Sequence, residues 1–278
     1  MYLTDDAIRH PFRIPGSGQL NDRLPLRGQI ALVTGASMGI GAATACELAR
    51  RGAQVVLVAR GAHQLQEQAS MINAEGGKAL AMPADVSDPE QVERLIADVR
   101  DAFGRFDVLV NNAASGWAKL LAHSSPAEIR QVVATNLTGP ILVTRAVLPD
   151  MLSRHRGTII NVASVSGRVA VEPLYSATKY GLRGFSLSLR RQLANSGVSV
   201  CVVSPGKIRT NMTRDSNEPM DEPEIVAEAI ARLSVNPRRE VVVPCKYYAM
   251  VWLEQALPGL ADRAYKWRHR KYSVDGSF

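Results

Sequence analysis

Tyr175 and Lys179 are the residues whose types and spacing most directly suggest a chemical reaction. They stand four positions apart in a strongly helical pattern, so both side chains project from one face of the helix. A phenol has an ordinary pKa of about 10 and is a poor base at neutral pH, but a fixed ammonium group nearby stabilises the phenolate and lowers that pKa. The pair predicts a proton donor or acceptor for a substrate oxygen, and an incidental helix pair is the alternative.

A glycine-rich stretch, Thr34 to Gly41, is the second chemical feature. It joins a predicted strand directly to a predicted helix. Glycines in such a position allow a tight turn and let backbone amides at the positive end of a helix approach a pyrophosphate. We therefore predict that this turn binds a dinucleotide through Gly35, Ser37, Met38, Gly39, Ile40 and Gly41.

The elements that must position these residues alternate between apolar runs and helical patterns from residue 29 onward. The predicted strands are 30–34, 53–59, 79–85, 108–111, 158–162, 198–203 and 240–243. This alternation is typical of an α/β fold, a single-domain doubly wound parallel sheet (Rossmann-like) with helices on both faces. We predict an N-terminal arm at 1–25, a catalytic domain at 26–245 and a C-terminal extension at 246–278.

The sequence also marks where several helices begin and bend. Ser87 and Ser125 each precede a glutamate by three residues, the spacing in which both side chains satisfy free backbone amides at a helix start. In the long helix after Ser125 we expect Gly139-Pro140 to cause a bend, since proline removes an amide and crowds the preceding turn. The helix that carries the tyrosine and lysine pair is predicted over about 176–194.

Taken together, these motifs resemble the short-chain dehydrogenase/reductase family over residues 26–244. The resemblance rests on the spacing Thr-Gly-x-x-x-Gly-Ile-Gly, on the Tyr-x-x-x-Lys pair, and on the order of the smaller motifs between and after them. It implies hydride transfer between a nicotinamide cofactor and a carbonyl or alcohol. It also implies catalytic roles for Asn136, Ser164, Tyr175 and Lys179, and cofactor contacts for Asp85, Val86, Asn112, Ala113, Ala114, Tyr175, Lys179, Pro205, Gly206, Ile208 and Thr210.

The chain departs from the family pattern between the catalytic serine and tyrosine. Ser164 and Tyr175 are eleven residues apart, which is shorter than in many members, so the loop between them should be short. Ser166 is a rival for the serine role. We prefer Ser164, because Ser164 followed three residues later by Gly167 matches the family motif.

The end of the second predicted strand indicates which cofactor binds. An acidic residue there would hydrogen-bond the ribose hydroxyl of NAD, but this chain has Ala59-Arg60. The guanidinium of Arg60 can form a charge-assisted fork on the 2′-phosphate, which favours NADP(H). Mixed use with NAD(H) is the alternative, because Met38 stands where many NADP-using relatives carry a second basic residue.

Apolar residues are expected to form the substrate pocket. Candidates lie in 115–121, in 165–174 and around Met212 after Pro205-Gly206. Val169, Val171, Leu174 and Met212 would give mostly apolar walls, which suit a lipophilic ketone, aldehyde or secondary alcohol. A 3-oxoacyl-thioester reductase is one alternative, although the short Gly-Gly tail of such enzymes is missing. An NADP(H)-binding regulatory protein without catalysis is another, although such proteins generally lack the tyrosine or lysine that this chain keeps.

Composition limits the remaining classes. The formal charge is +7, but basic residues are scattered apart from a concentration at Lys266, Arg268, Arg270 and Lys271, so we expect no nucleic-acid partner. Three cysteines and a polar N-terminus predict a reduced, cytoplasmic protein, and we expect no metal. The resemblance implies a homodimer or homotetramer.

The C-terminal extension contains aromatic and basic residues. Such a region can cap the substrate pocket, pack on a neighbouring subunit or lie on a membrane surface. We expect an ordinary capping helix.

Overall fold

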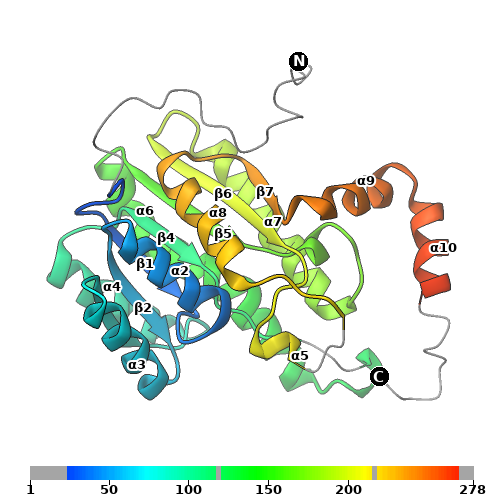
Figure 1. Cartoon of the computed structure of the whole chain (residues 1–278), viewed down its shortest axis with the longest axis horizontal. Coiled ribbons are helices and arrows are strands. Elements are labelled where there is room, and N and C mark those ends of the chain that lie inside the picture. The colour runs from blue at the N-terminus through cyan, green and yellow to red at the C-terminus, as the bar shows by residue number, and fades with distance from the viewer. Residues whose placement is uncertain (1–23, 117–119, 215–217, 269–278) are drawn as a thin grey trace.

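The fold is built on a seven-stranded parallel sheet with the strand order β3-β2-β1-β4-β5-β6-β7 (Figure 1). The computed structural model describes residues 24–116, 120–214 and 218–268. The strands are β1 (Ile30–Thr34), β2 (Gln54–Ala59), β3 (Lys78–Pro83), β4 (Val108–Asn111), β5 (Gly157–Val162), β6 (Val198–Pro205) and β7 (Glu240–Val243). The predicted doubly wound parallel sheet is therefore confirmed.

Helices cover both faces of this sheet. The α-helices are α2 (Gly39–Arg50), α3 (Ala62–Ala74), α4 (Pro89–Phe103), α5 (Pro126–Val133), α6 (Gly139–Ser153), α7 (Pro173–Gln192), α8 (Pro223–Val235), α9 (Tyr248–Ala256) and α10 (Pro258–Arg268). Short turns of other helix types are η1 (Leu121–His123), η2 (Ala134–Thr138), η3 (Val165–Gly167), η4 (Asn211–Thr213) and η5 (Cys245–Tyr247).

Two apolar clusters hold the layers together. Alternate residues of β1 point to opposite faces, so Ala31 and Val33 join one cluster while Ile30 and Leu32 join the other. The first cluster receives buried side chains from α2, α3 and α8, and the second from α4, α6 and α7. Central strands such as β1 and β4 are buried along their whole length, so they read as continuous hydrophobic runs in the sequence.

Of the two helix caps predicted from the sequence, the structure confirms one and corrects the other. Ser125 forms the predicted capping box with Glu128. The prediction for Ser87 was wrong: Asp88 caps α4, accepting hydrogen bonds from the amides of Glu90 and Gln91. Ser87 instead donates to the Asp85 carboxylate at 2.7 Å. Since a carboxylate binds helix amides more strongly than a hydroxyl, the adjacent aspartate takes the cap position.

The long helix after Ser125 changes its hydrogen-bonding pattern just before Gly139-Pro140, and the bend expected there stays a prediction. Residues Ala134–Thr138 form a π-helical turn, η2, between α5 and α6. The whole stretch Pro126–Ser153 is long and apolar enough to span a membrane by length and composition. Its buried residues, among them Val143, Val147 and Met151, pack into the second apolar cluster, so it serves as a core helix.

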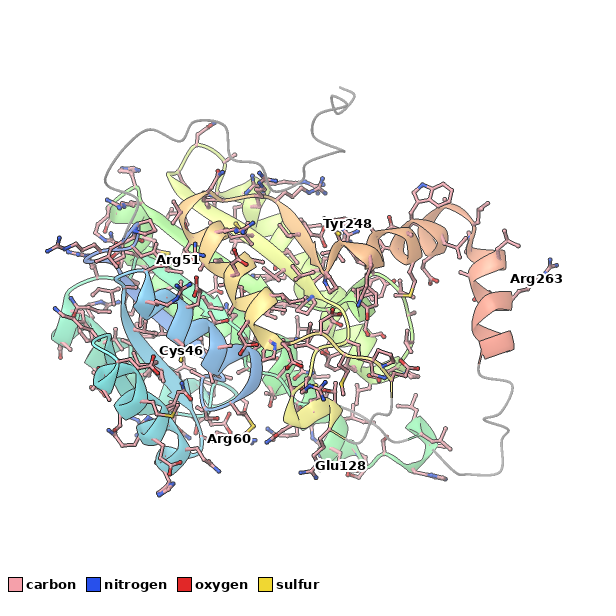
Figure 2. The ribbon with its side chains drawn as sticks, in the orientation of Figure 1. Cys46, Arg51, Arg60, Glu128, Tyr248 and Arg263 are labelled. Atoms are coloured by element: carbon pink, nitrogen blue, oxygen red, sulfur yellow. The ribbon has the colours of Figure 1, made fainter. Side chains whose placement is uncertain are left out.

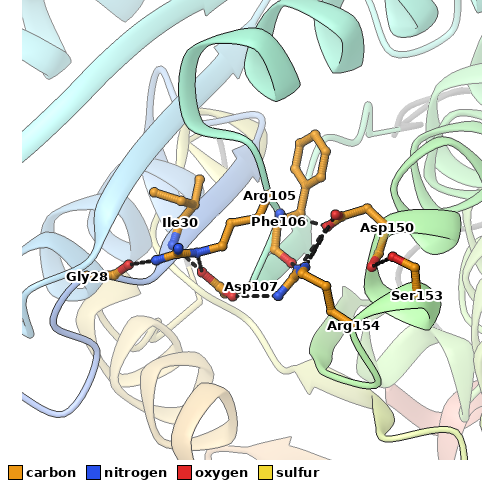
Figure 3. Close-up of polar contacts among 8 residues, drawn as sticks. All are labelled: Gly28, Ile30, Arg105, Phe106, Asp107, Asp150, Ser153 and Arg154. Atoms are coloured by element: carbon orange, nitrogen blue, oxygen red, sulfur yellow. Dashed lines mark hydrogen bonds and ion pairs between the residues drawn. The ribbon is translucent and has the colours of Figure 1, made fainter.

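A buried ionic network fastens the amino ends of the strands (Figure 3). The Asp107 carboxylate accepts hydrogen bonds from the Ile30 amide at 2.9 Å, from Arg105 at 3.0 Å and from Arg154 at 3.2 Å. Arg154 also pairs with Asp150 at 2.8 Å. Burial alone would raise the pKa of Asp150, but hydrogen bonds from Arg154 and from the Phe106 amide lower it. The network joins the amino ends of β1 and β4 to the end of α6.

We predict that Asp107→Ala lowers the free energy of unfolding by about 3 kcal/mol, because it leaves the buried Ile30 amide without its acceptor and removes one of the two carboxylates that pair with Arg154. Urea denaturation followed by circular dichroism measures the change. Asp98→Ala, an exposed position on α4, is the matched control and should change stability by no more than about 0.5 kcal/mol. Equal effects of the two substitutions would show that the network contributes nothing specific.

Candidate active site

One cavity of about 690 Å³ lies along the carboxyl ends of the central strands. It runs from Arg60 and Asp85, after β2 and β3, past the glycine-rich turn to Tyr175 and Lys179 on α7. The carboxyl ends of parallel strands meet at one edge of the sheet, and the strand order places β1 beside β4 at the point where the winding direction reverses. The cavity therefore occupies the position where open α/β sheets bind ligands.

Most residues predicted for the site line this cavity. They are Gly35, Ser37, Met38, Gly39, Ile40, Arg60, Asp85, Val86, Asn112, Ala113, Ala114, Ser164, Tyr175, Lys179, Pro205, Gly206, Ile208 and Thr210. Gly41 and Asn136 do not, and each has a supporting position instead. A Cβ on Gly41 would lie 2.0 Å from the carbonyl oxygen of Gly35, so this glycine lets α2 pack closely behind the turn.

The glycine-rich turn has the shape that a pyrophosphate requires. Gly35 and Gly39 adopt positive φ values of 66° and 56°, a conformation that L side chains rarely take. A Cβ on Gly35 would lie 2.8 Å from the Cα of Ala113. The first amides of α2 begin at Gly39 and face the cavity, at the positive end of the helix. Bare backbone thus forms the wall that a phosphate can approach.

Hydrogen bonds fasten this turn to the end of β4. The Thr34 hydroxyl accepts from the amides of Asn112 at 3.0 Å and Ala113 at 3.1 Å. The Asn112 side chain donates back to the carbonyl oxygens of Thr34 at 3.0 Å and Gly35 at 3.2 Å. The motif predicted to contact a ribose therefore also holds the neighbouring turn in place.

The catalytic helix begins earlier than predicted. Because α7 starts at Pro173, Tyr175 lies within its first turn and Lys179 one turn further along. The Lys179 ammonium is buried, donates to the carbonyl oxygen of Val162 at 2.9 Å and lies 5.6 Å from the centre of the Tyr175 ring. Burial lowers the pKa of Lys179 to about 8.

The pKa of Tyr175 corrects the sequence-based expectation. Burial, with a smaller contribution from the negative charge of Glu172, raises this pKa to about 12, although a hydrogen bond with Ser164 acts in the opposite direction. We had expected the nearby ammonium to lower it. In this site removal from water outweighs the attraction of Lys179, since desolvation penalises the phenolate. Tyr175 is therefore a neutral phenol at pH 7, the form that donates a proton.

The short loop after β5 presents Ser164 rather than Ser166 to the cavity. The Ser164 hydroxyl accepts from the Ser166 amide at 3.0 Å, so Ser166 supports its neighbour through the backbone. A Cβ on Gly167 would lie 2.8 Å from the carbonyl oxygen of Lys179, which shows how tightly η3 packs on α7. This close packing brings the serine and the tyrosine together in spite of the shortened loop.

Asn136 lies in the π-helical turn η2 and is fully buried. Its side-chain oxygen accepts from the Ser115 amide at 2.7 Å, and its nitrogen donates to the Ser115 carbonyl at 2.9 Å and to the Thr178 hydroxyl at 3.3 Å. Asn136 thus joins the cavity wall at Ser115 to α7. Asn136 does not line the cavity, so it is not placed to contact a bound molecule directly. Its role in proton relay stays a prediction.

The predicted substrate walls are only partly present. Gly116 and Met212 line the cavity and contact one another, with the Met212 Cγ 2.8 Å from where a Cβ on Gly116 would lie. The prediction for Val169 and Leu174 was wrong, because both are buried away from the cavity. Val171 is exposed and does not line it either. Residues 117–119 of the predicted wall lie outside the described residues.

An ionic clamp behind the site was not predicted. The Glu240 carboxylate, at the start of β7, accepts from Arg168 at 2.7 Å and from Arg183 at 2.8 and 3.1 Å. Burial would raise the pKa of Glu240, but the two guanidinium groups lower it. The clamp joins the residue after η3 to the middle of α7, so it fixes the serine loop against the tyrosine helix. No spacing in the sequence links these three residues.

Comparisons with known proteins agree with this geometry. The family model for short chain dehydrogenase matches residues 29–221. The chain belongs to the short-chain dehydrogenase family. It is therefore an oxidoreductase of that family, and its alternating sheet, glycine-rich turn and Tyr-x-x-x-Lys helix are those on which the resemblance was based.

Individual relatives cover most of the chain. The ketoacyl reductase HetN of Nostoc sp. is 36% identical over 257 residues, covering 87% of this chain and 90% of that protein. A 3-oxoacyl-[acyl-carrier-protein] reductase of Synechocystis sp. is 40% identical over 225 residues, covering 76% and 91%. A metagenomic short-chain oxidoreductase solved in complex with NADP is 38% identical, with a TM-score of 0.71, covering 79% of this chain and 97% of that one.

We predict that Glu240→Gln lowers the free energy of unfolding by at least about 2 kcal/mol and loosens the serine loop, because two partly buried guanidinium groups lose their counter-charge. Hydrogen–deuterium exchange should then quicken in residues 164–172 more than in β1 or β4. Glu228→Gln, in an exposed ion pair with Arg232 on α8, is the control and should leave that exchange unchanged. Unchanged exchange in 164–172 for Glu240→Gln would contradict the clamp.

Proposed function

We propose that this protein is an NADP(H)-dependent reductase that converts a lipophilic ketone or aldehyde into the alcohol. The observation that carries the proposal is the meeting of Ser164, Tyr175 and Lys179 in the same cavity as the glycine-rich turn. A proton donor and a dinucleotide cradle at one surface suit reduction of a carbonyl group. The same site would catalyse oxidation of a secondary alcohol in the reverse direction.

The residues of α7 and the serine loop supply the proton chemistry. A bound NADPH would supply a hydride to the carbonyl carbon. The Ser164 hydroxyl would donate a hydrogen bond to the carbonyl oxygen, and the Tyr175 phenol would transfer its proton to that oxygen as the alcohol forms. The Lys179 ammonium then stabilises the phenolate left behind. Since burial keeps Tyr175 neutral at pH 7, its charge state supports the reductive direction.

The far end of the cavity supports NADP(H) over NAD(H). Arg60 directly follows β2 and is labelled in Figure 2. Its side chain is 69% exposed, and its guanidinium lies 3.9 Å from the Asp85 carboxylate. At that distance and exposure the ion pair is weak, so the guanidinium can turn to a phosphate with twice the charge. Ala59 and Arg60 place no carboxylate at the end of β2, where it would repel that phosphate.

The nature of the substrate has two candidates. Gly116 and Met212 give the cavity that contains Tyr175 an apolar wall, which supports a lipophilic carbonyl compound. The names of the relatives favour a second candidate, a 3-oxoacyl thioester, whose ketone also sits on an apolar chain. Both candidates use the same proton donor and the same cofactor and differ in what lies beyond the ketone.

We further propose that the protein is a cytoplasmic homodimer or homotetramer. Cys46, Cys201 and Cys245 are free thiols, which supports a reducing compartment. The family to which the chain belongs supports the oligomer.

A panel of ketones tests the function and its cofactor in one assay. We predict that NADPH absorbance falls faster than NADH absorbance with an apolar aliphatic or aromatic ketone, and that Arg60→Asp reverses this order, because a carboxylate binds the ribose hydroxyl and repels the phosphate. A 3-oxoacyl thioester in the same panel separates the two substrate candidates. Equal use of both cofactors before and after the substitution would contradict phosphate recognition by Arg60.

The matched control for this panel is Tyr175→Phe. It removes the transferable proton while keeping the ring, so turnover should be lost while the protein still binds NADPH in a fluorescence titration. Turnover by this variant at the rate of the unchanged enzyme would refute the proposed role of Tyr175.

A further inference from the structure

The described part of the C-terminal extension does not line the cavity, whereas we expect a capping helix from the sequence. The lining residues end at Arg214, and among the described residues of the extension none lines the cavity. The described part of the extension meets the cavity wall at Gly206. There the Tyr247 ring packs on this glycine, and the Tyr247 hydroxyl accepts from the Lys207 amide at 3.2 Å. Beyond Tyr247, α9 and α10 extend to one side of the sheet (Figure 1). Their exposed faces therefore need another explanation.

The extension is anchored along one side and apolar on others. Val251 of α9 is buried against Val165, Val169 and Val242, so the start of the extension is fixed to the body. On α9 and at the start of α10, five large apolar side chains are exposed: Tyr248, Met250, Trp252, Leu257 and Leu260. We call these five residues the extension surface. Trp252 is 63% exposed, more than any other large apolar residue that the structure describes.

Such a concentration differs from ordinary surface composition. Single exposed apolar residues are common, but five within thirteen residues are a concentration of the kind found at interaction sites. Tyr248 and Trp252 are four positions apart on α9, so they share one helix face. The Tyr248 hydroxyl accepts from the Val242 amide at 3.2 Å, which fixes the start of α9 to β7 and leaves Trp252, one turn further, exposed.

Charge identifies the occupant. Residues 263–271 contain five basic residues and no acidic residue, together with Tyr265 and Trp267. Arg263 is exposed and points away from the body on α10 (Figure 2). A twofold contact of the extension with a second copy would bring two such basic runs together, which is unfavourable. Aromatic and aliphatic residues next to basic ones instead match the boundary between lipid headgroups and acyl chains.

We propose that the extension docks on a membrane surface rich in anionic phospholipid. Trp252 with other side chains of the extension surface enters the boundary of the acyl chains, and Arg263 contacts lipid phosphates. The positive charge of the sequence after Arg263 adds to the attraction for anionic lipid. This binding goes beyond the proposed function and does not depend on it. It would hold η5 at the membrane, and η5 carries the tyrosine that packs on Gly206 at the cavity wall.

Sedimentation with vesicles tests the proposal on the full chain. The vesicles contain either phosphatidylcholine alone or equal parts of phosphatidylcholine and phosphatidylglycerol. We expect the protein to pellet with the anionic vesicles at about 0.1 M salt and to be largely released at about 0.5 M, where charges are screened. Trp252→Glu should lower the partition coefficient about tenfold, because it puts a carboxylate into the boundary region.

Two controls separate this outcome from others. Met71→Glu, at an exposed apolar position on α3, should bind vesicles like the unchanged protein. Tyr175→Phe should also bind, so loss of catalysis and loss of membrane binding are distinguishable. Circular dichroism checks that Trp252→Glu keeps its fold, and Trp252→Gln serves as a milder variant.

Two results would overturn the proposal. One is that the unchanged protein pellets with anionic vesicles no more than with phosphatidylcholine vesicles, or no more than both Trp252 variants do. The other is found by light scattering: Trp252→Glu lowers the oligomeric state while vesicle binding is unchanged. In that case the extension surface is a contact between subunits.

Discussion

The site depends on a buried ammonium group. Lys179 is 2% exposed, and its hydrogen bond goes to a backbone carbonyl, Val162, at the end of β5. A buried charge with a neutral partner is costly, which is why burial lowers the pKa of this lysine to about 8. Its position therefore has to be enforced by the surrounding structure. Close packing of η3 on α7, the Glu240 clamp and the Asn136 bridge each fix α7 against a neighbouring segment.

The same burial gives the tyrosine its chemistry. A phenol near the surface would titrate close to its ordinary range, whereas burial raises the pKa of Tyr175 to about 12. The pKa values of the lysine and the tyrosine are thus moved apart: the ammonium loses its proton more easily and the phenol less easily. When the phenol gives up a proton to a substrate oxygen, Lys179 is already in place to meet the charge that appears.

Sequence patterns reached the fold and most of the site because both depend on local signals. β1, β4 and β7 begin and end where the apolar runs predict, and Ser125 caps its helix as its spacing with Glu128 requires. Glycines at positive φ and a tyrosine one turn from a lysine are equally local. The predictions that failed depend on tertiary packing. The sequence does not show that Val169 packs against Val251 instead of lining the cavity, or that Asp88 rather than Ser87 caps α4. It also does not show which arginines pair with Glu240.

The shifted pKa values were also beyond sequence reasoning, because they depend on how much water the fold excludes. The most direct test of the account is the pH dependence of kcat/KM for ketone reduction by NADPH, which reports groups in the free enzyme. We predict a plateau below pH 8, with a fall above it as Lys179 loses its proton, since its pKa is about 8. Lys179→Arg, which stays charged, should move that fall to higher pH at a lower rate. A profile that is flat through pH 10, or unchanged in Lys179→Arg, would contradict the account.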